Sequence, residues 1–189
     1  MKLGKIKQVC KAARQVLILT ADRTVDNAVV QWIGTAGALY PVTGLELTLQ
    51  MLAVLWEIDL TKGDWEAAEG TMSDMVDRGL LAPEDEQLLR TLPASVDTTS
   101  MPLLGLGEVN GYKALACGAE GMLFLQGWPL DPCYGKAGCN YEVVRGADYR
   151  VAVYSGGMIA GLVWPVEKAT ADALGGFVSS MARRTVCGV

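Results

Sequence analysis

The sequence contains no histidine. A Ser-His-Asp or Cys-His catalytic arrangement is therefore excluded, and so is a metal centre built on imidazole ligands. Because general acid and base chemistry most often uses histidine, we expect a protein that is not an enzyme and needs no cofactor. Pairs of carboxylates are the remaining catalytic alternative, since aspartate and glutamate are plentiful, but no spacing singles out any pair.

The cysteines do not form CxxC pairs, although five are present: Cys10, Cys117, Cys133, Cys139 and Cys187. Scattered thiols of this kind do not have the spacing of a zinc site, so we expect no bound metal. Cys133 and Cys139 flank a short glycine-containing loop and could bridge if oxidised. A cytosolic chain would keep them reduced, and reduced thiols are the prediction that we favour.

Long apolar runs are also missing. The longest runs, such as residues 156–166, are much shorter than the roughly 18 residues that a bilayer span requires. Lysines interrupt the apolar positions at the N-terminus, so no secretory signal is expected there. These features predict a cytoplasmic protein without membrane contact.

Positive charge is scarce and is concentrated at one end. The formal net charge is -5, yet residues 1–21 carry five basic residues and no acidic one. Leu3, Ile6 and Val9 recur there at helical spacing, which predicts a basic amphipathic helix over residues 3–14. Its lysines either contact nucleic acid or face solvent and pair with the acidic middle of the chain. Five charges provide limited attraction to phosphate, so we favour the second alternative.

A seven-residue phrase occurs twice in the chain. Residues 36–42 read Ala-Gly-Ala-Leu-Tyr-Pro-Val, and residues 160–166 read Ala-Gly-Leu-Val-Trp-Pro-Val. Each copy follows an apolar stretch that contains glycine, and each precedes a segment with a helical pattern. Proline within a strand suits an edge or an end. The repetition therefore predicts two related structural units, in each of which a strand ends at proline and leads into a helix.

The predicted fold is α+β, with two pseudo-repeated antiparallel β-hairpin/helix units and an acidic helical insertion in one compact domain. The first unit spans residues 1–58, with strands at 16–20, 28–33 and 38–42 and a helix at 45–58. The insertion spans residues 59–92, with one helix at 64–78 and another that begins at Pro83. A Gly/Pro-rich linker follows at residues 93–121. The second unit spans residues 122–189, with strands at 122–126, 142–144, 149–155 and 158–164 and a helix at 169–184.

Aromatic side chains provide the best candidate for a binding site, because their faces can stack on a flat ligand. The candidates on hairpin strands beside glycine turns are Trp32, Tyr40, Tyr154 and Trp164, and Trp128 lies in a Gly-Trp-Pro loop. Arg145 and Arg150 are the candidate partners for phosphate. The alternative for aromatics on short strands is packing in the core or in cross-strand pairs.

The N-terminal residues 1–7 and the segment Gln31-Trp32-Ile33-Gly34 with residues 38–42 resemble small uncharacterised proteins of phages and prophages of Gram-positive gut bacteria. This resemblance covers about the first quarter of the chain. It implies a replication accessory, a host-takeover protein or a protein that neutralises host immunity. The last class includes non-enzymatic sponges that sequester nucleotide second messengers and are usually oligomeric.

A second resemblance is to the repeated subdomains of DNA sliding clamps. The order of a helix at 3–14, strands, Tyr40-Pro41-Val42 and a helix at 45–58 is similar to theirs. The acidic insertion at 59–92 departs from the clamp pattern, and the second copy has no clear leading helix. No site residue is carried over from this resemblance.

Together these features predict a non-enzymatic, phage-type binding protein in the cytoplasm of the host cell. It is expected to form a homo-oligomer and to sequester a small nucleotide-like signal against host immunity. The alternative is a replication or host-interaction protein with a sliding-clamp-like architecture, which acts through protein or DNA surfaces.

Overall fold

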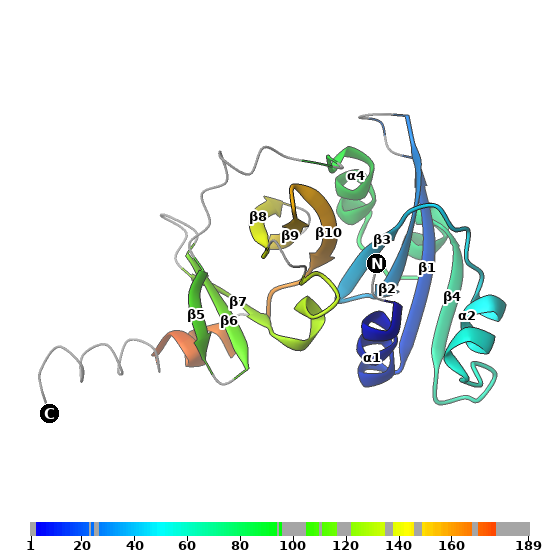
Figure 1. Ribbon diagram of the computed structural model, residues 1–189, viewed down its shortest axis with the longest axis horizontal. Coiled ribbons are helices and arrows are strands. Elements are labelled where there is room, and N and C mark those ends of the chain that lie inside the picture. The colour runs from blue at the N-terminus through cyan, green and yellow to red at the C-terminus, as the bar shows by residue number, and fades with distance from the viewer. Residues whose placement is uncertain are drawn as a thin grey trace, which may run out of the picture.

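The computed structural model describes residues 3–22, 24, 27–93, 95, 105–109, 111–116, 122–134, 138–145, 149–167 and 170–176. Helices and strands occur together in a mixed arrangement, so the predicted α+β class is confirmed (Figure 1). The elements are α1 (Leu3–Ala13), β1 (Gln15–Asp22), β2 (Val29–Thr35), β3 (Ala38–Val42), α2 (Leu49–Trp56), β4 (Glu66–Thr71), α3 (Met72–Asp77), α4 (Pro83–Thr91), β5 (Gly105–Val109), β6 (Tyr112–Ala116), β7 (Met122–Gln126), the 3₁₀ turn η2 (Trp128–Leu130), β8 (Asn140–Arg145), β9 (Tyr149–Ser155) and β10 (Met158–Val163). Residues 170–176 form a further helical segment.

The larger sheet has seven strands in the order β4-β1-β2-β3-β10-β9-β8. It consists of two antiparallel meanders, β1-β2-β3 and β8-β9-β10, joined where β3 pairs with β10. β4 adds to the outer side of β1 in the parallel direction. Strands from near both ends of the chain therefore form one continuous sheet.

The two copies of the repeated phrase lie side by side at the centre of this sheet. Leu39 pairs with Leu162 and Ala38 pairs with Val163 in the antiparallel direction. The third position of each copy thus faces the fourth position of the other, which is the pairing that a local two-fold relation produces. The repetition in the sequence corresponds to the pairing that joins the two meanders.

Both faces of the larger sheet are buried, because its central strands are apolar on both sides. In β1, Val16 and Ile18 belong to one hydrophobic cluster, whereas Leu17 and Leu19 belong to another. This alternation follows from the two-residue period of a strand. Side chains from α1 and α2 contribute to the first cluster, and side chains from α3 and α4 to the second.

The smaller sheet has three antiparallel strands in the order β5-β6-β7. Leu115 and Leu125 point toward the core of the larger sheet, whereas Ala114 and Phe124 pack against Leu174 of the segment 170–176. Figure 1 shows this sheet beside the larger one. Lys113 also reaches across, with Nζ 4.7 Å from the ring centroid of Tyr141 in β8. These contacts pack the smaller sheet against the larger one.

The predicted helix at 64–78 is wrong in its first part, because residues 66–71 form β4 and only residues 72–77 are helical. The sequence Glu-Ala-Ala-Glu favours a helix locally, but propensity is a weak preference that tertiary pairing overrides. Here the partner is β1, to which β4 pairs over its whole length. The helix predicted at 45–58 is also shorter, since Thr48 caps α2 by accepting a hydrogen bond from the Met51 N–H at 3.2 Å.

The segment 93–121, which was predicted as a linker, contains β5 and β6. Val109 pairs with Tyr112, and Gly111 has a positive φ of 79°. The sequence Asn-Gly at 110–111 is a strong local hairpin signal. Of the closing helix predicted at 169–184, residues 170–176 are helical, and residues 177–184 lie outside the described part.

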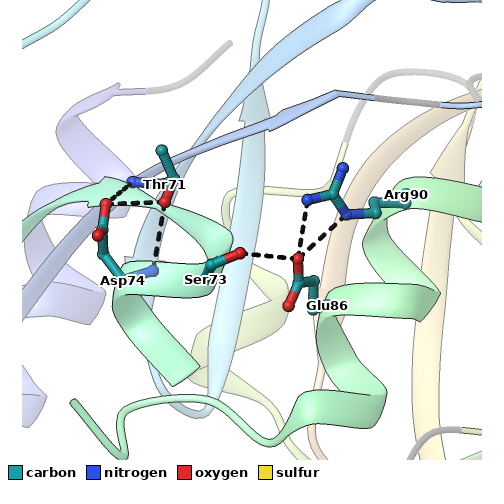
Figure 2. A network of polar contacts seen from close by, with 5 residues as sticks. All are labelled: Thr71, Ser73, Asp74, Glu86 and Arg90. Carbon is teal, nitrogen blue, oxygen red and sulfur yellow. Dashed lines mark hydrogen bonds and ion pairs between the residues drawn. The ribbon is translucent and has the colours of Figure 1, made fainter. Parts of the chain in front are cut away.

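A network of polar side chains holds the start of α3 against α4 (Figure 2). Thr71 and Asp74 form a reciprocal capping box, and Ser73 donates a hydrogen bond to Glu86 at 3.1 Å. Arg90 donates to the same Glu86 oxygen at 2.8 Å. These hydrogen bonds hold the pKa of Glu86 and of Asp74 below their ordinary values. The acidic residues of this region thus cap and connect helices.

The surroundings of the two glycines in the repeated phrase predict that replacement by alanine changes the free energy of unfolding at one of them and not at the other. A Cβ on Gly161 would lie 2.7 Å from Cys133 Sγ and 3.1 Å from Tyr40 Cδ1, whereas one on Gly37 would meet only Thr35 Oγ1 at 3.9 Å. We expect Gly161→Ala to lower the free energy of unfolding by about 1–3 kcal/mol through overpacking. Gly37→Ala is the matched control and should change it little. Equal midpoints of urea unfolding for the two variants would contradict this expectation.

Candidate ligand-binding cavity

Three of the predicted ligand-binding aromatics are buried within the core. Trp32 and Tyr154 belong to the cluster under α3 and α4, and Tyr40 belongs to the cluster on the opposite face. Each is at most 1% exposed. The Tyr40 hydroxyl donates a hydrogen bond to the Pro129 carbonyl at 2.5 Å, and burial raises the pKa of this phenol far above its ordinary value. Tyr40 thereby ties β3 to η2.

The predicted phosphate partner Arg150 lies in a buried ion pair. Its Nε and Nη2 donate to the two carboxylate oxygens of Asp85 at 2.9 and 3.1 Å, and its Nη1 donates to the Tyr149 carbonyl at 3.0 Å. The guanidinium also lies 4.8 Å from the ring centroid of Trp164. Arg150 therefore connects β9 to α4 and supports Trp164. The other predicted arginine, Arg145, pairs through its backbone with Tyr149, and its side chain lies outside the described part.

The remaining two aromatics, Trp128 and Trp164, line one cavity. It has a volume of about 430 Å³ and lies where the smaller sheet approaches the centre of the larger one. Tyr112 of β6 and Gln126 of β7 contribute from the smaller sheet, and Thr35 and Ala38 from β2 and β3. A volume of this size falls within the range of small-molecule pockets.

The walls of the cavity are fixed by hydrogen bonds. The backbone N–H of Trp164 donates to the Gly37 carbonyl at 3.0 Å, and the backbone N–H of Val166 donates to the Phe124 carbonyl at 2.9 Å. Gln15, also in the lining, accepts from the Ala36 N–H at 2.6 Å and donates to Glu66 at 2.7 Å. Two prolines, Pro129 and Pro165, complete the apolar part of the wall. Backbone hydrogen bonds to both sheets therefore hold the segment that carries Trp164 and Val166 in place.

The charge of the cavity favours some ligand groups over others. Glu167 is the one charged residue among the described residues of its lining. An anionic phosphate inside the cavity would thus lack a cationic partner from this lining, whereas a neutral planar ring would meet aromatic and amide groups. Trp128 is 42% exposed and also lines a neighbouring cavity of about 270 Å³ with Lys5 and Gln8 of α1. Positive charge is available there, beside Asp131.

Sequence reasoning missed Tyr112 and Gln126 as lining residues. Tyr112 lies in the segment predicted as a linker, and Gln126 ends a correctly predicted strand. The Asn-Gly pair at 110–111 would have indicated the hairpin that carries Tyr112. No comparable signal marks Gln126, because its place beside the cavity depends on how the two sheets pack.

Three cysteines lie in the described part of the chain: Cys10, Cys133 and Cys139. Burial raises the pKa of the Cys10 thiol to about 12, and burial likewise raises the pKa of Cys133. Their thiols donate to the carbonyls of Gly34 and Ala160, respectively. Thiols so buried and so weakly acidic are poor nucleophiles at neutral pH. Cys117 and Cys187 lie outside the described residues.

Within the described ranges, no cluster of three or more Cys, Asp or Glu side chains is arranged to hold a metal ion. None of the helices in this part of the chain is both long and apolar enough to cross a membrane. Comparisons of the chain with protein-family models, with curated proteins and with solved structures find no match.

Proposed function

We propose that this protein is a non-catalytic binding protein that sequesters a small nucleotide-like ligand, with the base of the ligand in the cavity between the two sheets. The observation that carries the proposal is the joint lining of this cavity by Trp128, Trp164 and Tyr112. Stacking of a base on an aromatic side chain contributes about 1–3 kcal/mol and tolerates different bases.

The charge of the lining supports one orientation of this ligand. The base would occupy the cavity between the two sheets, where Glu167 is the charged group among the described lining residues. The phosphate would extend past Trp128 toward Lys5 in the neighbouring cavity. The absence of histidine from the sequence supports a binding role over catalysis. The biological role that we propose with it is the capture of a host signal by a phage protein.

The test is binding of a panel of nucleosides, cyclic nucleotides and ADP-ribose derivatives, measured by thermal shift and by depletion of free ligand. For a ligand that binds, Trp128→Ala should weaken the affinity by tenfold or more, and Trp128→Phe should retain most of it. Lys5→Ala should weaken phosphate-bearing ligands but not the matching nucleosides. Met158→Ala, at an exposed apolar residue outside the cavity, is the control.

If no member of the panel shifts the melting temperature or is depleted from solution, the proposal fails. The clamp-like alternative stays a prediction, which a ring-shaped assembly with salt-sensitive retention of DNA would support.

A further inference from the structure

Helix α2 is apolar on nearly every side. Seven of its eight residues are hydrophobic, in the sequence LQMLAVLW. Leu52 and Trp56 are buried in the core cluster that also contains α1 side chains. Met51, Val54 and Leu55 point outward and are 48%, 76% and 56% exposed. Because a helix that is apolar all round is normally covered on all sides, this outward face requires an explanation.

The exposed apolar surface continues beyond the helix. Of the seven large hydrophobic residues exposed in the described part, five belong to this region: Val29, Leu45, Met51, Val54 and Leu55. An open depression of about 500 Å³ lies over the outer side of α2, and one of about 530 Å³ is lined by Val29 and Leu45. We call Leu45, Met51, Val54 and Leu55 the α2 face. Exposed apolar residues that gather in one region of a fold mark interaction sites.

The charges at the ends of the α2 face distinguish between possible occupants. Glu46 precedes the helix and Glu57 follows it, and both are exposed. If a second copy packed its own α2 here, glutamates would face glutamates in the parallel and in the antiparallel orientation, and like charges across an interface are unfavourable.

A helix with an apolar stripe and basic flanks would match both the exposed apolar residues of the α2 face and the glutamates at its two ends. We propose that the α2 face docks a basic amphipathic helix of a partner protein. Its apolar stripe would cover Met51, Val54 and Leu55, and its lysines or arginines would pair with Glu46 and Glu57. The described basic helix of this chain, α1, is not the occupant, because its apolar residues Ile6, Val9 and Cys10 are already buried. The α2 face shares no lining residue with the inter-sheet cavity, so the two proposals are independent.

The experiment uses the full chain and a fluorescent synthetic helix with leucines on one face and lysines on the other. The matched probe carries glutamates in place of the lysines. Fluorescence anisotropy should show binding of the leucine/lysine helix, and the leucine/glutamate helix should bind at least tenfold more weakly. Val54→Gln and Leu55→Gln should each weaken the leucine/lysine helix by tenfold or more. Joint replacement of Glu46 and Glu57 by glutamine should weaken it severalfold and reduce its salt dependence.

The control is Met158→Gln, which changes an exposed apolar residue outside the α2 face and should leave binding unchanged. Circular dichroism tests whether each variant is folded, and Val54 is 76% exposed, so we expect it to accept glutamine. Equal binding of the leucine/lysine helix by wild type and both α2 variants would overturn the proposal. So would equal binding of the two probes. Sedimentation velocity that shows a wild-type dimer and a Val54→Gln monomer would instead assign the face to a second copy.

Discussion

Replacement of Asp85 by alanine is expected to lower the free energy of unfolding by about 3–5 kcal/mol. The change would leave the Arg150 guanidinium buried without its carboxylate, and the side chains of Arg150 and Asp85 are only 8% and 2% exposed. The cost of an unpaired buried charge exceeds the net contribution of the pair itself. Urea unfolding followed by circular dichroism measures the difference between the variant and the wild type.

The matched control is Glu84→Ala, which removes an exposed carboxylate from the same first turn of α4. Its expected cost is about 0.3–1 kcal/mol, from the lost interaction with the helix dipole. The double variant Asp85→Leu with Arg150→Met removes both charges and should recover much of the lost stability. An Asp85→Ala variant that is as stable as Glu84→Ala would contradict the buried ion pair.

The ion pair also links the core to the candidate cavity. Arg150 lies against the ring of Trp164, and Trp164 forms part of the cavity wall. Arg150 of β9 thus connects Asp85 of α4 with Trp164, which follows β10. A variant that releases Arg150 is therefore expected to affect the wall on which the proposed ligand stacks.

Elements defined by local pattern were predictable from the sequence. The amphipathic spacing of α1, the apolar run of β1 and the glycine turn between β9 and β10 each carry their signal within a few residues. β4 was not predictable in this way, because its residues favour a helix and become a strand only through pairing with β1. The helix that should have contained it therefore begins at Met72.

The candidate site was predictable in composition but not in arrangement. The sequence indicates which residues are aromatic and that they lie near turns, but burial depends on the pairing of β3 with β10, more than 100 residues apart. The same limit applies to Arg150, whose partner Asp85 is 65 residues away in the sequence. Long-range contacts of this kind separate the core residues Trp32, Tyr40 and Tyr154 from the cavity residues Trp128 and Trp164.

Because Trp32 is a core residue, its replacement is expected to have a second large effect on the free energy of unfolding. Trp32→Ala should lower the free energy of unfolding by about 3–5 kcal/mol, because it leaves a cavity in a core where the indole is fully buried. Trp32→Phe should cost much less than Trp32→Ala. It preserves most of the ring volume, and it removes an indole N–H for which the described residues provide no hydrogen-bond acceptor.

Trp128 provides the comparison, since it has the same side chain in an exposed position. Trp128→Ala should change the free energy of unfolding by no more than about 1 kcal/mol, while it removes the proposed stacking surface. Urea unfolding and ligand titration on the same three variants separate the two roles, because a core residue changes the unfolding midpoint and a cavity residue changes the affinity. If Trp32→Ala unfolds at the wild-type midpoint, Trp32 does not stabilise the core as expected. The ligand-binding role predicted for Trp32 from the sequence would then be the better explanation.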